Sequence, residues 1–319
     1  MSLTRRTTLL ACGAALVSGP AGAQQPTKLT LGTATPGGGF PVYGAAFIET
    51  VMRHDPALWI EAVNTKGSAE NVPRLEADTL DLALVQGEVL HESLAGIGGR
   101  PPSRIKAITA MYPTAGMFVV RADSPYRTIA DLKGKPIAWG AAGSGLVVLG
   151  RYAMDGLGLD AGKDFTPIYL EKAGDGPAMV LDGRAAALWG GGTGWPGFTT
   201  VMSSREGGRF IAPSAEEIKR ILQQHSFLKP VIQAARSFPG QTEAISSVGS
   251  WSFVMARRSL PYDIAYRLAK ALGAAEKSLP KQLVDTTAQN TAAAVTSRDM
   301  LHPGAMAYVM GDRNFWIKP

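Results

Sequence analysis

The sequence predicts an α/β protein with two lobes, each a mainly parallel sheet flanked by helices, and a ligand cleft between the lobes. Three observations lead to this prediction. From Lys28 onward, short apolar runs alternate with helix-like segments, which is the pattern of βαβ units. Glycine-rich loops lie where several of these runs end and helices begin. A late apolar run and helix fit better as a return to the first lobe than as a separate domain.

The first lobe begins with three strand-like runs separated by helix-like segments. Turn residues bound each apolar run, as is typical of buried strands. Pro73 places the start of the second helix at about Val72. The expected strands are Leu29–Gly32, Leu58–Asn64 and Leu80–Gln86, and the expected helices are Tyr43–Arg53 and Val72–Ala77.

The second lobe repeats the alternation, and the chain then returns to the first. "AAALWGGGTGWPGFTTVM" again places a strand before a glycine loop and a helix, and "WSFVMAR" precedes a long helix. We expect hinges near Tyr112–Val120 and Ser250–Met255, with residues 24–115 and 251–319 in lobe I and 116–250 in lobe II. The elements expected early in lobe II are strands Met117–Arg121 and Pro136–Trp139, a short helix Thr128–Lys133, and a helix Leu146–Leu157.

The N-terminus has the pattern of a secretory signal peptide. Arg5 and Arg6 precede an apolar stretch, and Ala21-Gly22-Ala23 follows it, so residues 1–23 are expected to be cleaved after Ala23. We therefore expect a periplasmic protein, exported by either the general or the twin-arginine route. The only cysteine lies within this segment, so no disulfide is expected afterwards, and its reading as a lipoprotein box ranks low because little apolar sequence precedes it.

The charge does not indicate a nucleic-acid partner. The formal net charge is +6, but the basic residues are spread along the chain and do not alternate with aromatic residues. A mildly basic solvated surface explains this composition.

Three glycine loops are the main candidates for a binding site: residues 33–43, 65–71 and 140–145. Glycines allow close approach to the free main-chain N–H groups of a helix's first turn, where the helix dipole favours an anion. In open α/β sheets such strand ends face one crevice. Each loop alone could be structural, and Ser68 or Ser144 could simply cap a helix. Together they favour a small anion, most plausibly a carboxylate.

Aromatic residues near the loops are candidate walls of a pocket. We favour this role for Phe40 and Tyr43, which follow three glycines, and for the tryptophans of "WGGGTGWPGF". Tyr112 and Trp251 could equally belong to the core. The candidate ligand-binding residues are Thr33, Thr35, Gly38, Gly39, Phe40, Tyr43, Thr65, Gly67, Ser68, Asn71, Gln86, Ser144, Gly145, Trp189 and Trp195.

No arrangement typical of an enzyme is found in the sequence. It has no G-x-S-x-G motif, and no cysteine after the signal peptide. His91-Glu92 begins like a zinc-protease motif, but Ala95 stands where the second histidine is required. We therefore expect no catalytic residues, no metal and no cofactor.

In order along nearly the whole chain, several segments resemble the TAXI group of substrate-binding proteins, the periplasmic receptors of TRAP transporters. The segments are "LGTATPGGGFPVYG", "NTKGSAEN", "DLALVQGEV", "DLKGKPIAWGAAGSG" and "LHPGAMAYV". The resemblance implies a type II periplasmic-binding-protein fold. The two lobes would close on a small organic acid or amino acid and deliver it to an ion-driven membrane permease.

The resemblance also implies ligand contacts in residues 33–43 and 65–71, at Gln86, and at Ser144-Gly145. The chain departs from the family's pattern at Thr35, Pro36, Gly39, Leu146 and Ala186. Because hydroxyl groups are lost, the ligand could be a bulkier or more apolar carboxylate. A receptor for an ATP-driven importer or a ligand-presenting sensor protein is the alternative, and an enzyme on this scaffold ranks below both.

Overall fold

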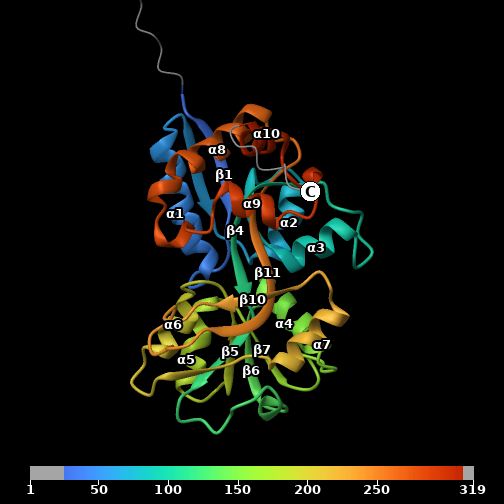
Figure 1. Cartoon of the computed structure of the whole chain (residues 1–319), viewed down its shortest axis with the longest axis vertical. Helices are drawn as coiled ribbons and strands as arrows, with labels where there is room; N and C mark the ends of the chain where they lie inside the picture. Colours follow the sequence, from blue (N-terminus) through green and yellow to red (C-terminus); the bar gives the residue numbers. More distant parts are fainter. Residues whose placement is uncertain (1–24, 312–319) are drawn as a thin grey trace, which may run out of the picture.

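The computed structural model describes residues 25–311, which form two lobes stacked along the long axis of the molecule (Figure 1). Each lobe contains one sheet with helices on both faces. The predicted signal peptide, residues 1–23, lies outside the described residues. Within residues 25–311, none of the helices combines the length and the apolar character that a membrane crossing requires.

The sheet of lobe I has six strands: five follow the order β10-β11-β3-β1-β2, and β4 pairs with the edge of β11 opposite β3. Strands β2 and β3 both pair with β1 in parallel, whereas β11 is antiparallel to β3, β4 and β10. The strands are β1 Thr27–Gly32, β2 Leu58–Val63, β3 Leu82–Gln86, β4 Lys106–Ala115, β10 Lys229–Gln233 and β11 Ile245–Ala256.

The sheet of lobe II has five strands in the order β7-β6-β8-β5-β9. Strand β6 is parallel to β7 and β8, and β5 is antiparallel to β8 and β9. The strands are β5 Met117–Arg121, β6 Pro136–Ala141, β7 Thr166–Leu170, β8 Ala187–Gly190 and β9 Gly208–Ile211.

The two sheets are therefore mixed, and the expectation of mainly parallel sheets is corrected. In lobe I, the physical reason is the connection between the lobes. Strand β4 carries the chain from lobe I to lobe II and β11 carries it back, so these neighbouring strands must run in opposite directions (Figure 1). The α/β class and the two-lobed arrangement are as predicted.

Helices cover both faces of each sheet, and hydrophobic side chains of the helices face the strands. In lobe I, α1 and α8 pack on one face and α2 and α3 on the other. In lobe II, α4 and α7 cover one face and α5 and α6 the other. The helices are α1 Gly39–His54, α2 Ser68–Glu76, α3 Gly87–Ala95, α4 Gly145–Asp155, α5 Gly176–Leu181, α6 Pro196–Met202, α7 Ala215–Gln224, α8 Tyr262–Ala275, α9 Ala288–Ala294 and α10 Pro303–Gly311, and the 3₁₀ turns are Ala130–Leu132, Ala173–Asp175, Glu276–Ser278, Lys281–Leu283 and Arg298–Met300.

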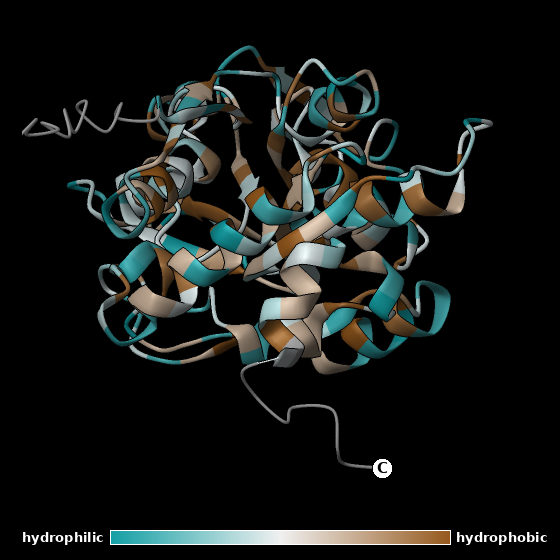
Figure 2. Cartoon of the chain, turned by 90° about the horizontal axis from the view of Figure 1, so that it is seen from above, coloured by the Kyte–Doolittle hydropathy of each residue, from teal (hydrophilic) through white to brown (hydrophobic). Residues whose placement is uncertain are grey.

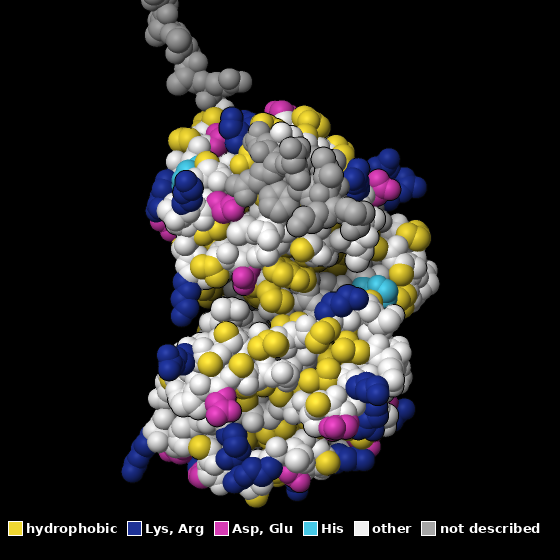
Figure 3. Space-filling view, viewed as in Figure 1, with side chains coloured by type: hydrophobic (Ala, Val, Ile, Leu, Met, Phe, Trp, Pro, Cys, Tyr) yellow, Lys and Arg dark blue, Asp and Glu magenta, His cyan; other side chains and the backbone are white. Residues whose placement is uncertain are grey.

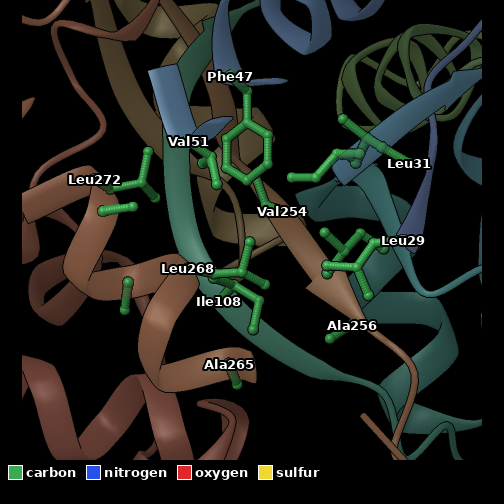
Figure 4. Close-up of a cluster of buried hydrophobic side chains, with 14 of the residues drawn as sticks. Leu29, Leu31, Phe47, Val51, Ile108, Val254, Ala256, Ala265, Leu268 and Leu272 are labelled. Atoms are coloured by element: carbon green, nitrogen blue, oxygen red, sulfur yellow. The ribbon is translucent and has the colours of Figure 1, made fainter. Parts of the chain in front are cut away.

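The core of lobe I explains why β1 and α1 face each other. Leu29 and Leu31 alternate along β1 and point to the same face, where they meet Phe47 and Val51 of α1 (Figure 4). Each such buried side chain contributes about 1.5–3 kcal/mol relative to exposure. Seen from above, brown hydrophobic segments face the interior and hydrophilic residues are frequent in the outer turns (Figure 2). The packing fixes the end of β1, from which the first glycine loop leaves.

Strand β11 belongs to the cores of both lobes. Its Val248 is buried in lobe II, whereas Val254 is buried in lobe I. Beside it, the main-chain N–H of Gly116, between β4 and β5, donates to the Val248 carbonyl at 3.0 Å. The expected lobe boundaries, 115/116 and 250/251, fall between β4 and β5 and inside β11. The two strands are therefore the covalent links across which the lobes can hinge.

Two helices begin earlier than the sequence predicts. Helix α1 begins at Gly39, not at Tyr43, and α2 begins at Ser68, not at Val72. Pro41 lies in the first turn of α1, where main-chain N–H groups have no helical partner, so a proline costs little there. Pro73 lies inside α2 and removes one hydrogen bond without ending the helix. Both helices therefore begin directly at the glycine loops, with Gly38 and Gly67 as their N-cap residues.

Candidate functional site

A cavity of about 50 Å³ lies between the two lobes. The space-filling view shows the waist between the lobes, with hydrophobic side chains on both sides of it (Figure 3). The cavity is lined by Ala34, Thr35, Gly38, Gly39, Phe40, Gly67, Ser68, Gln86, Tyr112, Thr114, Gly140, Ala141, Ser144, Gly145, Leu146, Ala173, Gly191 and Trp195.

Three helices begin at this cavity: α1 and α2 from lobe I and α4 from lobe II. Their N-cap residues are Gly38, Gly67 and Ser144, and no side chain caps any of the three by a hydrogen bond. A helix start carries about half a positive charge on its free N–H groups. The three starts therefore favour an anion in the cavity without any cationic side chain. The contribution of α2 is weaker, because its Ala69 N–H is used by the Gly143 carbonyl and Glu70 lies in its first turn.

Two buried polar atoms on cavity-lining residues have no hydrogen-bond partner among the described residues: Gln86 Nε2 and Ser144 Oγ. Gln86 ends β3 and is 3 % exposed. Its main-chain N–H donates to Ser68 Oγ at 3.1 Å, which fixes the position of the residue. An unpaired buried polar group costs about 1–3 kcal/mol, so these atoms indicate a polar partner inside the cavity.

The cavity wall carries no charged side chain. Among its lining residues, all within the described part of the chain, there is no Lys, Arg, His, Asp or Glu. Burial raises the pKa of Tyr112 further above its ordinary value, so its hydroxyl stays neutral. Phe40, Leu146 and Trp195 provide apolar surface. The site thus combines positive helix ends with a mainly apolar wall.

Main-chain hydrogen bonds join the lobes around the cavity. The N–H of Ala173 donates to Thr35 Oγ1 at 3.1 Å, and the N–H of Ala69 donates to the Gly143 carbonyl at 3.1 Å. Gly174 and Gly37 are so close that a Cβ on Gly37 would lie 2.4 Å from the Gly174 Cα. This is a closed conformation, with the loops of opposite lobes in direct contact.

A second set of contacts joins the lobes outside the cavity, between α3 on one side and α4 and Phe227, which lies between α7 and β10, on the other. Glu92 of α3 forms an ion pair with Arg151 of α4, and the Tyr152 hydroxyl donates to Glu92 Oε1 at 2.9 Å. The rings of His91 and Phe227 stack with their centroids 4.0 Å apart. We call these five residues the α3–α4 latch.

Many of the residues predicted from the sequence come together at the cavity. Glycine and serine at the three helix starts, Gln86, and two of the aromatic residues are among them. The predicted residues that line the cavity are Thr35, Gly38, Gly39, Phe40, Gly67, Ser68, Gln86, Ser144, Gly145 and Trp195.

Five predicted residues lie behind the wall and hold it in place: Thr33, Tyr43, Thr65, Asn71 and Trp189. The Asn71 amide donates to the carbonyls of Thr33 and Leu84, at 2.9 and 2.8 Å, and so joins the ends of β1 and β3. Thr65 Oγ1 accepts from the Gly67 N–H at 3.1 Å.

The two aromatic residues of this set hold other elements. The Trp189 indole donates to the Leu146 carbonyl at 2.8 Å, in the first turn of α4. The Tyr43 hydroxyl lies 2.8 Å from Thr286 Oγ1. Both aromatic side chains are core residues.

The sequence reasoning missed several lining residues. The sequence is equally consistent with a core and a pocket position for Tyr112. Leu146 adjoins the predicted Gly145, and Gly140 lies inside the predicted loop 140–145. Ala173 follows β7 in the glycine-rich "KAGDGP", a signal of the same kind as the other loops. Ala34 and Ala141 lie inside the predicted glycine loops and Gly191 inside "WGGGTGWPGF", whereas Thr114 has no signal in the sequence.

A family model described as the NMT1-like family matches residues 31–310 of this chain. The chain belongs to the NMT1-like family. Its fold is similar to that of the periplasmic binding protein BugD, with 14% identity over 90% of this chain and 94% of the other, at a TM-score of 0.55. A protein described as a periplasmic transporter gives 14% identity, 84% and 89% coverage, and a TM-score of 0.54.

A Bordetella bronchiseptica RB50 protein gives similar values: 17% identity, coverage of 89% of this chain and 80% of the other, and a TM-score of 0.54. At such identities the comparison concerns the fold alone. The periplasmic-binding-protein-like fold expected from the sequence is confirmed.

The segment "LHPGAMAYV" of this NMT1-like chain contributes no residue to the cavity lining. His302 accepts from the Gly304 N–H at Nδ1 and its Nε2 contacts the Leu260 carbonyl at 3.0 Å. Burial lowers the pKa of His302, which keeps the ring neutral in this arrangement. The segment therefore anchors α10 to α8.

Proposed function

We propose that this protein is a periplasmic receptor of the TAXI type, which captures a small organic acid or amino acid and delivers it to a TRAP-type membrane permease. One observation carries the proposal: the starts of three helices from two lobes open onto one cavity between the lobes. Such helix starts bind anions through main-chain N–H groups. The signal-peptide pattern of the sequence supports export to the periplasm.

The proposed mechanism is capture without chemistry. In an open form, the lobe I starts of α1 and α2 bind the anionic group. Lobe II then rotates about β4 and β11 and adds the start of α4. Within the described residues, the moving bodies of this proposal are residues 25–115 with 251–311, and residues 116–250, whose strand β10 continues the sheet of lobe I through β11. The population of the closed state rises only through contacts that the open state lacks, such as the hydrogen bond between Thr35 and Ala173.

Small-angle X-ray scattering and calorimetry test the receptor function. We expect a ligand from a panel of organic acids and amino acids to bind and to reduce the radius of gyration. Product analysis after incubation should find the ligand unchanged. Binding without a change in radius, or turnover of the ligand, would contradict the proposal.

The partner is tested separately, because a receptor for an ATP-driven importer shares the fold. The membrane subunits encoded beside this gene should be reconstituted in proteoliposomes with the ligand-loaded receptor. Uptake driven by an ion gradient without ATP is expected for a TRAP-type permease. Uptake that requires ATP would assign the receptor to an ATP-driven importer.

A further inference from the structure

We infer that the cavity selects a short monocarboxylate whose other groups carry no charge, and that it rejects amino acids and dicarboxylates. The inference rests on the proposed function, because it names the class of ligand for the same site. It follows from charge, from the two unpartnered polar atoms, and from size.

The charge of the wall favours a single negative group. The positive helix starts of α1, α2 and α4 suit one carboxylate, and the described lining offers no carboxylate to an ammonium group and no cation to a second carboxylate. Burying a charged group costs free energy of desolvation, and this cost is not recovered when the group has no partner of opposite charge. The zwitterion of an amino acid and the second charge of a diacid would both be uncompensated.

Glu88 does not supply the missing carboxylate. It lies two residues after Gln86 in the first turn of α3, is fully buried, and does not line the cavity. The Ser250 and Gln86 side chains face its carboxyl group closely enough to oppose the rise of its pKa, although the Gln86 amide makes no hydrogen bond of good geometry to it. Gln86 therefore separates Glu88 from the ligand space.

The unpartnered atoms fit a carboxylate. The Gln86 amide nitrogen can only donate, and a Ser144 hydroxyl can donate to an oxygen. They come from opposite lobes, β3 and the start of α4, so a ligand that binds both also holds the lobes together. Neither group compensates a positive charge as a carboxylate would.

Size and polarity restrict the rest of the ligand. The cavity of about 50 Å³ suits a small molecule, and it is partly open to solvent. Beyond the helix starts, the wall includes the Phe40 and Trp195 rings and the Leu146 side chain. The rest of the ligand, if it is uncharged and mainly aliphatic, can be buried against this wall without the desolvation of a charged group.

Isothermal titration calorimetry with matched four-carbon ligands tests the inference. The purified protein is titrated at neutral pH with butanoate, 2-aminobutanoate, succinate and butanamide, and with monocarboxylates one or two carbons shorter or longer. We expect a monocarboxylate to bind roughly 100-fold more tightly than its amino, dicarboxylate or amide counterpart. An amino acid or diacid that binds as tightly would overturn the inference.

The variant Ser144→Asp gives a second test. Aspartate is a good N-cap, so α4 should still form, but its charge competes with the ligand for the helix start. We expect monocarboxylate affinity to fall by roughly 100-fold or more. Ser214→Asp makes the same change at the N-cap of α7, far from the cavity, and should bind like the parent. Equal binding by Ser144→Asp and the parent would overturn the inference.

The outcomes separate this inference from the proposed function. If an amino acid binds and the radius of gyration falls, the receptor function stands and the monocarboxylate class is wrong. If ligands of no class bind, the receptor function itself fails.

Discussion

Thr35 of lobe I accepts a hydrogen bond from the main-chain N–H of Ala173 in lobe II, with 3.1 Å between Oγ1 and N. Both residues also line the cavity. The contact therefore exists only when the lobes are closed, and it couples closure to the wall around the ligand. Its removal should weaken closure without disturbing either lobe.

Thr35→Val should lower ligand affinity by roughly 5- to 100-fold, because an unpaired buried N–H costs about 1–3 kcal/mol in the closed state alone. Valine keeps the shape and removes the acceptor. Thr35→Ser keeps the hydroxyl and should restore most of the affinity. Calorimetry measures both, and parental affinity in the valine variant would contradict the role of this contact.

Gly37→Ala should prevent closure. Gly37 has a φ of +83°, and a Cβ there would lie 2.4 Å from the Gly174 Cα of the other lobe. Gly134 has a φ of +72° and nothing near its Cβ position, so Gly134→Ala carries similar backbone strain without the clash. Each should lose about 1–2 kcal/mol of stability from strain.

Ligand-dependent scattering separates the two glycine variants. Gly134→Ala should still contract when ligand is added, whereas Gly37→Ala should keep the open radius and bind at least roughly 100-fold more weakly. A contraction of Gly37→Ala equal to that of Gly134→Ala would show that these loops do not meet on closure.

Glu92→Gln should loosen the α3–α4 latch modestly. Glu92 pairs with Arg151 across the lobes, and the Arg151 side chain is 58% exposed, so the pair is worth at most about 1 kcal/mol. We expect a loss of affinity of roughly 2- to 5-fold at low salt, shrinking as salt screens the pair. Asp123→Asn breaks an ion pair with Arg121 inside lobe II and should leave affinity unchanged.

Glu88 should make the closed protein less stable as the pH rises. Burial raises the pKa of Glu88 from its ordinary value of 4.5 to about 7, although nearby Ser250 and Gln86 oppose the rise. The folded state therefore holds this proton more tightly than the unfolded chain does. The stability it gives is fully present below pH 4.5 and is lost as the pH passes through about 7.

The free energy of unfolding of the parent and of Glu88→Gln, measured across this pH range, isolates the contribution of Glu88 to stability. The parent should lose on the order of 3 kcal/mol relative to the variant between the two limits. The groups facing Glu88 are Glu92 on α3 and Tyr152 on α4, with Arg151 beside them, and all are retained in both proteins. Parallel pH profiles would indicate that Glu88 is ionised in the fold.

The position of the site could be predicted because glycines mark it. Gly39, Gly67 and Gly145 follow apolar runs, and such residues are required where a chain leaves a strand and approaches a ligand or another loop. In the structure, all three lie at helix starts that face the cavity. Local sequence is sufficient for this because the strand, the loop and the helix are consecutive.

The direction of each side chain could not be predicted in the same way. Thr33 and Thr35 belong to one loop, yet Thr33 Oγ1 bonds the Val63 carbonyl behind the wall while Thr35 lines the cavity. Asn71 was expected to contact ligand, but it joins the ends of two strands. Which way these groups point depends on strand pairing between distant segments.

Residues that line the cavity without a functional side chain could not be predicted either. Ala173 and Gly191 reach the cavity only because lobe II folds over lobe I, and neither has a side chain that indicates binding. The mixed sheet of lobe I has the same origin, since the return of β11 beside β3 is a long-range pairing. Tertiary contacts determine these features.

Native mass spectrometry of the protein purified from its own host tests the central claim most directly. The parent should carry one small organic anion per chain, released on denaturation, and Gly37→Ala, which cannot close, should carry none. A parent that carries no small anion and binds none when soaked with the acid panel would contradict the account. So would a Gly37→Ala variant that retains the same molecule as the parent.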